Sequence, residues 1–409
     1  MSFDVALTGL NAASTDLAVT ANNIANSNTT GFKESNTDFA DVYAASSQDI
    51  SATTPGSGVR VAGITQQFSQ GSINYTNNNL DMAISGNGFF IVSQGGNLEY
   101  TRAGSFAVDR NGYVVTPSDG ARLQVYPPIA GTDGFNTGSL ADLQLSTSAG
   151  APQASSLINL SANFKADAVP PAVSTFDPTN PASYNNAIST TVYDSLGTAR
   201  TATLYLVKDG ATPNTWSSYL YVDGTAVGAA QPVTFNPDGS LATPTGGSVA
   251  YGAFTPTNGA NPLNLTIDFT GTTQFGGDFS TNKLTQDGYA SGQLSGINID
   301  CSGVVQARYS NGRSVPLGQV ALANFPDPQG LQKQADTRWT ETFASGAPLR
   351  GIAGTSGLGQ IQSGALEASN VDLTAELVHM IVAQRSYQAN AQMISTMNGI
   401  SQTITNIIR

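Results

Sequence analysis

The two ends of the chain carry a seven-residue apolar repeat. Near the N-terminus the repeat has two registers three residues apart, one of large and one of small side chains. These are Phe3, Leu10, Leu17 and Ile24, followed by Ala6, Ala13 and Thr20. This spacing is typical of the a and d positions of a coiled coil. It predicts a helix over residues 1–30, which ends near the Asn-rich stretch before Gly31 because Asn and Gly disfavour helix.

The same repeat returns over residues 366–409, where no proline interrupts it. The residues that we assign to this part of the seam are Leu366, Leu373, Leu377, Met380, Tyr387, Ile394 and Ile408. The pattern predicts one helix from about 370 to 407. Both helices are poor in charge, so they can pack on several sides, and we predict that they form a coiled coil. On periodicity alone, two ordinary helices buried in a globular domain are an alternative.

The middle of the chain has a different pattern. No glutamate occurs between Glu99 and Glu341, and aspartate often precedes glycine. Asp-Gly and Asn-Gly pairs favour the positive φ angles of hairpin turns. The segments between them, such as 201–207 and 263–269, are rich in Val, Thr, Leu and aromatic residues. The middle is therefore predicted to be β-rich.

Two stretches of small and polar residues, near 146–152 and 280–288, predict domain boundaries. We expect a discontinuous, multi-domain subunit that is mainly β with α-helical termini. Its predicted parts are a terminal helical domain (1–30 and 366–409), a connecting segment (31–72 and 352–365), a β-rich middle domain (73–150 and 287–351) and an inserted β-rich outer domain (151–286).

Charge and hydropathy exclude several classes of function. The net charge of −12 argues against a nucleic-acid binder, which needs a basic surface. No window is apolar enough for a membrane-spanning helix, so no membrane insertion is expected. No basic residue precedes Lys33, and no signal peptide is evident. The chain is thus expected to be cytoplasmic or exported without a cleaved signal peptide.

The sequence contains few residues of the kinds that usually carry out catalysis. His379 is the only histidine and Cys301 the only cysteine, which excludes the usual zinc sites. We predict no catalytic residue, no metal site and no cofactor, and hence no enzyme. Two carboxylates suffice for a glycosidase, so a secreted β-rich carbohydrate-active or carbohydrate-binding protein is kept as an alternative.

Short motifs near the two ends resemble those of the bacterial flagellar axial proteins, the family of rod, hook and hook-associated subunits. The N-terminal motif lies within residues 21–33 and the C-terminal motif within residues 369–373. The residues that carry the resemblance are Asn23, Ala25, Asn26, Thr29, Gly31, Phe32, Asn370, Val371 and Asp372. Their occurrence at opposite ends of one chain makes the resemblance specific.

Within that family, the bulk of the 151–286 insert is similar to hook subunits and exceeds what the shorter distal rod subunits carry. The resemblance implies a structural subunit that polymerises into a curved, flexible tube, a universal joint that transmits motor torque from rod to filament. It also implies type III export to an extracellular location. The partners implied are copies of the same chain, the distal rod protein, the hook cap protein and the hook–filament junction protein. A distal rod or other axial subunit is the alternative within the family.

Overall fold

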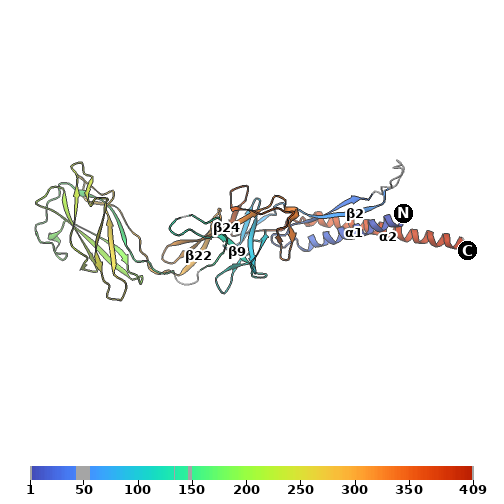
Figure 1. Cartoon of the computed structure of the whole chain (residues 1–409), viewed down its shortest axis with the longest axis horizontal. Coiled ribbons are helices and arrows are strands. Elements are labelled where there is room, and N and C mark those ends of the chain that lie inside the picture. Colours follow the sequence, from blue (N-terminus) through green and yellow to red (C-terminus); the bar gives the residue numbers. More distant parts are fainter. Residues whose placement is uncertain (1, 43–55, 133, 146–149, 408–409) are drawn as a thin grey trace. The chain divides into compact units, whose positions relative to one another are not determined.

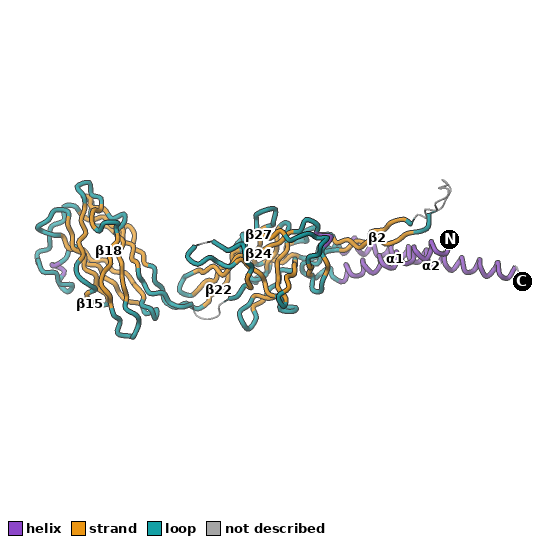
Figure 2. Tube along the Cα trace, in the orientation of Figure 1, coloured by secondary structure: helices purple, strands orange, loops and turns teal. Residues whose placement is uncertain are grey.

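A computed structural model describes residues 2–42, 56–132, 134–145 and 150–407, and the chain divides into two compact units. Unit 1 comprises Met1–Leu145, Gly296–Arg308 and Ser314–Arg409, and unit 2 comprises Ser146–Ser295 and Tyr309–Arg313. In the described residues, α-helix is confined to the two terminal segments of unit 1, and the β-strands lie between these segments (Figures 1 and 2). The predicted fold class, mainly β with helical termini, is therefore confirmed. The finer four-part division stays a prediction.

The terminal helices are α1 (Ser2–Ala25) and α2 (Leu373–Ile407). α1 ends before residue 30, the predicted limit, because the Asn26 side chain donates a 2.9 Å hydrogen bond to the Asn22 carbonyl and the chain then turns. Asp372 caps the start of α2, since its Oδ1 accepts hydrogen bonds from the backbone N–H groups of Thr374 and Ala375.

Leu366 does not belong to the C-terminal helix, so its assignment to the helical repeat was wrong. It lies on strand β29 (Ala365–Glu367), which pairs with β3 (Ile73–Tyr75). Gly364 precedes β29 with φ of 70°, a left-handed conformation that favours glycine. The pairing with β3 holds this segment extended until Asp372. Ile408 lies outside the described residues.

Most strands of unit 1 form one large sheet. Its main path runs in the order β22 (Leu294–Ile299), β23 (Val304–Tyr309), β24 (Ser314–Asn324), β9 (Arg122–Tyr126), β5 (Phe89–Gln94), β6 (Asn97–Thr101), β26 (Arg338–Thr340) and β25 (Gln332–Lys333). Four short strands join it, namely β7 (Ala107–Val108), β8 (Val114–Val115), β10 (Ala141–Asp142) and β27 (Leu349–Ile352). Side chains alternate along β5, so Phe89 and Ile91 enter one apolar cluster while Phe90 and Val92 enter another.

Shorter pairings join the N-terminal and C-terminal parts of the chain. Besides β3 with β29, strand β4 (Met82–Ser85) pairs with β28 (Gln360–Ser363). The ribbon of β1 (Ser35–Asp41) and β2 (Val59–Gln66) follows α1. These pairings bring the segments before and after the β-rich body together where α1 ends and α2 begins.

Unit 2 consists of two sheets with a shared apolar core. One contains β18 (Ser248–Phe254), β19 (Leu263–Asp268), β11 (Leu157–Lys165), β20 (Thr273–Phe275) and β21 (Ser280–Gln286). The other contains β12 (Asn186–Tyr193), β13 (Ala199–Lys208), β14 (Thr215–Val222), β15 (Thr225–Ala226), β16 (Gln231–Phe235) and β17 (Leu241–Thr243). Phe164 and Trp216 meet edge to face between the sheets at 5.0 Å. As the turn chemistry predicts, Asp223 and Gly224 connect β14 and β15 with positive φ.

Candidate assembly surface

The terminal helices lie side by side and run antiparallel (Figure 1). At one end, Asn23 Nδ2 donates to Glu376 Oε1 at 3.2 Å. Farther along, a Cβ on Gly9 would lie only 2.8 Å from Asn390 Oδ1, so the missing side chain lets the helices approach. α2 has 35 residues against 24 in α1, and its C-terminal part extends beyond α1.

Within the chain, the contact between the helices uses mainly the small-residue register. Ala6, Ala13 and Thr20 are buried on α1, and Ala383 is buried on α2. The large residues of the predicted seam are less covered. Those that are partly buried are Leu10, Leu17, Ile24, Met380 and Ile394, and those that are exposed are Phe3, Leu373, Leu377 and Tyr387.

Further apolar side chains on α2 are open to solvent. They are Val378, Ile381, Val382, Met393, Ile400 and Ile404. Leu373 and Leu377 keep 46% and 42% of their accessible surface. The helix pair of one chain therefore leaves apolar side chains on both helices without an intramolecular partner surface, which is the pattern of a helix that packs on several sides.

Asn23 and Asn370 form hydrogen bonds that connect the ends of the helices to the β-rich body. Asn23 pairs with the backbone of Ser35, donating to its carbonyl at 2.8 Å and accepting from its N–H at 3.0 Å. Asn370 accepts from the Glu34 N–H at 2.8 Å and donates to the Gln67 carbonyl at 2.8 Å. The two asparagines thus satisfy backbone groups where the chain leaves α1 and enters α2.

The remaining motif residues shape the same region. Thr29 Oγ1 donates to Asn26 Oδ1 at 3.1 Å. Gly31 has φ of 69°, and a Cβ there would lie 2.4 Å from the Ala103 nitrogen, so only glycine fits. Phe32 is buried, and Asp372 caps α2 as described above. Ala25 is the exposed last residue of α1, and Val371 is partly buried beside the cap.

A buried ionic cluster joins the three segments that meet here. Glu367 accepts from Lys33 Nζ at 2.6 Å and from Arg102 Nη1 at 3.2 Å, and the Glu367 side chain is fully buried. Burial lowers the pKa of Lys33 and of Arg102, and the Glu367 carboxylate opposes that shift in both. Lys33 Nζ also donates to the Ser69 carbonyl at 2.6 Å.

Sequence reasoning missed this cluster, although one signal was available. Lys33 is the first basic residue of the chain and follows directly after the Gly31-Phe32 motif. A cation after a helix without basic residues needs an anionic partner if it is buried. The spacing could not indicate that the partner is Glu367, because 334 residues separate them.

Acidic groups gather around His379 between the helices. His379 Nδ1 lies 3.1 Å from Thr20 Oγ1, and its Nε2 lies 3.8 Å from Asp16 Oδ2. Burial raises the pKa of the nearby Glu34, Glu376 raises it further, and His379 opposes the shift. In the described residues, no group of three or more His, Cys, Asp or Glu side chains could hold a metal ion. No helix among them is long and apolar enough to cross a membrane.

Four family models match different parts of the chain. The model for the flagellar basal body rod protein matches residues 3–33, and that for the C-terminal part of the rod FlgEFG proteins matches 362–407. The model for the FlgE/F/G hook protein D1 domain matches 83–163, and that for the FlaE D2 domain matches 159–289. A β-rich subunit with paired helical ends and these matches belongs to the class of flagellar axial proteins.

Full-length relatives make the assignment more specific. The chain is 39% identical to the flagellar hook protein FlgE of Escherichia coli strain K12 over 414 residues, covering 100% of both chains. It is 34% identical to FlgE of Borreliella burgdorferi over 435 residues, covering 98% of both. The crystal structure of Helicobacter pylori FlgE2 shares the fold, with a TM-score of 0.55, 15% identity and coverage of 72% of this chain and 100% of that one. The chain belongs to the flagellar hook protein FlgE family and is a hook subunit.

Proposed function

We propose that copies of this chain polymerise through α1 and α2 into the curved, flexible tube of the hook. The observation that carries the proposal is the apolar surface that the helix pair leaves exposed, including Leu373, Leu377 and Ile381 on α2. Burial of apolar side chains between neighbouring copies would release this surface from water. The seam residues that lie on α1 and α2 are then contacts between subunits as well as within one.

The helices also provide a direction for growth. α2 extends beyond α1, and Ile400 and Ile404 are exposed on α2. A contact between different surfaces of identical subunits is heterologous, and it gives an open helical filament when the rotation does not close. Such a tube, continuous from rod to filament, would transmit motor torque while it bends.

The proposal includes the location and partners expected of a hook. The subunit is exported through the flagellar type III apparatus without a cleaved signal peptide and assembles outside the cell. Its further partners are the distal rod protein, the hook cap protein and the hook–filament junction protein. Support comes from the E. coli and B. burgdorferi relatives, which are named as hook proteins. The role is structural, without catalysis.

Removal of α2 tests the proposal. A variant ending at Asp372 keeps Glu367 and its ion pairs but lacks residues 373–409. Negative-stain electron microscopy of the full chain at high concentration should show curved tubes. The truncated variant should stay monomeric on size exclusion, with the strand signal in circular dichroism retained. Tubes formed by the truncated variant would overturn the proposal.

A further inference from the structure

Unit 1 presents a phenyl ring to solvent on a tight turn. Phe343 has a relative exposure of 105%, the highest among the exposed large apolar side chains of the described residues. Nearby Leu349 keeps 62% of its surface, and Ala344 and Ala347 are also exposed. Insertion of this ring into another molecule would remove its apolar surface from water.

Hydrogen bonds order the backbone of the turn that carries Phe343. Ser345 Oγ donates to the Thr342 carbonyl at 2.9 Å and accepts from the Thr342 N–H at 2.9 Å. Thr342 Oγ1 donates to the Gly330 carbonyl at 2.5 Å, which ties the turn to the neighbouring loop. An aromatic side chain on a preorganised backbone loses little conformational entropy on binding, which is typical of the anchor residues of interfaces.

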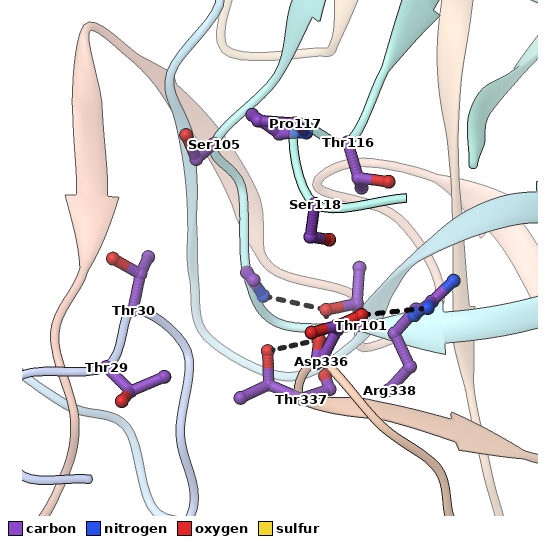
Figure 3. A pocket seen from close by; sticks show the side chains of 11 residues that line it. Thr29, Thr30, Thr101, Ser105, Thr116, Pro117, Ser118, Asp336, Thr337 and Arg338 are labelled. Carbon is purple, nitrogen blue, oxygen red and sulfur yellow. Dashed lines mark hydrogen bonds and ion pairs between the residues drawn. The ribbon is translucent and has the colours of Figure 1, made fainter. Parts of the chain in front are cut away.

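A pocket of matching character lies on the same unit (Figure 3). Its volume is about 260 Å³, and it lies between the turn after α1 at 29–30, the loop at 116–118 and the β25–β26 turn at 336–338. Phe343 follows the far end of β26, and its full exposure means that its own chain does not place it in this pocket.

The pocket is less polar than its many hydroxyl groups suggest. Thr101 Oγ1 donates to the Thr337 carbonyl at 2.9 Å, and Thr116 Oγ1 donates to Asp119 Oδ1 at 2.7 Å. Thr29 Oγ1 is likewise bonded to Asn26. Because these hydroxyls have partners within the chain, the threonines can offer their methyl groups to an apolar guest beside the ring of Pro117.

Arg338 also lines the pocket, and two acidic side chains neutralise its positive charge. Its side chain is only 6% exposed, and its guanidinium lies 2.8 Å from Glu99 and 2.6 Å from Asp119. A guanidinium paired in this way does not require an anionic ligand.

We propose that Phe343 of one copy inserts into this pocket of a neighbouring copy. The inference rests on the proposed polymerisation, which places other copies at high local concentration. The ring and the pocket are different surfaces of the same unit, so their contact is heterologous and repeats along an assembly without closing. It adds to the helical core a contact between β-rich bodies.

Assembly measurements test the ring and the pocket separately. Phe343→Ala should raise the critical concentration for tube formation about tenfold, as expected for an aromatic anchor. It should leave the thermal unfolding midpoint unchanged, because the ring is exposed in the monomer. Ser118→Trp, which fills the pocket from its exposed rim, should have the same effect. Phe343→Leu, which keeps an apolar side chain, should assemble better than Phe343→Ala. An unchanged critical concentration for Phe343→Ala and Ser118→Trp would overturn the inference.

A cysteine pair tests the contact directly. In a Cys301→Ser background, Phe343→Cys with Ser118→Cys should give a ladder of disulfide-linked oligomers when assembled tubes are oxidised, and none in the monomer. Phe343→Cys with Asn111→Cys, at another exposed turn of unit 1, is the matched control and should give no ladder. Tubes without the Phe343–Ser118 ladder would overturn the insertion and leave the proposed function intact. Failure of the unmodified chain to form tubes would count against the proposed function itself.

Discussion

Glu367 joins three segments of the chain through charge. Its carboxylate contacts Lys33, which follows α1, and Arg102, which follows β6, and it accepts from the Gly71 N–H at 3.0 Å. Replacing a buried ion pair by apolar residues is often harmless, whereas removing one partner leaves a buried charge uncompensated. The cluster therefore fixes the geometry where the helices meet the β-rich body.

Glu367→Gln should lower the free energy of unfolding of unit 1 by about 3 kcal/mol, because Lys33 and Arg102 would stay buried without their counter-ion. Urea denaturation followed by circular dichroism measures the change. Asp278→Asn is the matched control, since it removes the exposed Lys165–Asp278 pair and should leave the midpoint unchanged. An unchanged midpoint for Glu367→Gln would contradict a structural role for the cluster.

Glu34 makes stability depend on pH. Its pKa is raised above the ordinary value of 4.5 by burial and then by Glu376 and Asp372. The folded state therefore binds the proton more tightly than the unfolded state. The stabilising contribution of the protonated group is complete below pH 4.5 and is lost as the pH rises through the raised pKa.

Glu34→Gln should consequently raise the thermal midpoint more at pH 7 than at pH 4, because the amide stays neutral at both pH values and the fold favours the neutral form. The hydrogen bond from the Glu34 N–H to Asn370 is kept because it involves the backbone. Scanning calorimetry of both proteins at the two pH values is the measurement. A lower midpoint for the variant at pH 7 would show that the charged form is favoured in the folded state.

At the scale of elements, the sequence was most informative where one periodicity runs over many residues. The seven-residue repeat predicted both helices, and the predicted start of the second near residue 370 lies close to Leu373, where α2 begins. The same repeat misassigned Leu366, because spacing alone cannot reveal that β3, some 290 residues earlier, pairs with this segment. Nor could the sequence show that Ala6 and Ala13 are buried while Phe3 stays exposed, since both registers repeat with the same period.

Leu377 tests whether the exposed face of α2 is an assembly surface. Leu377→Asp should block tube formation, because assembly would bury an unpaired carboxylate at a cost of several kcal/mol. The monomer should keep its helix content, since the side chain is 42% exposed there. Leu377→Met, which conserves volume and apolarity, should assemble normally. Light scattering follows assembly and circular dichroism the fold. Normal tube growth by Leu377→Asp would exclude this face from the interface.

At the scale of the whole molecule, turn residues predicted the β character of the middle but not its sheets. Asp223-Gly224 and Asn311-Gly312 each join neighbouring strands, which local sequence can specify. The pairing of β11 with β21 connects residues more than 110 positions apart. Such pairings depend on which apolar faces meet in the core, which one sequence does not reveal. Gly150 and Gly292 form an antiparallel bridge, in which the Gly150 N–H donates to the Gly292 carbonyl at 2.8 Å. Gly150 is the first described residue of unit 2.

The Gly150–Gly292 bridge defines two positions between which the insert can be removed. Two residues paired in an antiparallel bridge can be joined by a two-residue turn, so residues 151–291 can be replaced by Asn-Gly. Unit 2 has its own apolar core and unit 1 has two others, so unit 1 should fold without the insert.

We expect the shortened subunit to polymerise, because α1, α2 and the Glu367 cluster are intact. The insert is predicted to form the outer layer of the tube, which moves most when the tube bends, and its weak contacts would repeat along every row of subunits. Their loss should give tubes that are straight or abnormally flexible, visible by electron microscopy as a changed curvature. Cells that make the shortened subunit should build filaments yet swim poorly. Tubes of unchanged curvature and stiffness would show that the insert has no mechanical role, whereas a folded subunit that forms no tubes would place the insert in the assembly core.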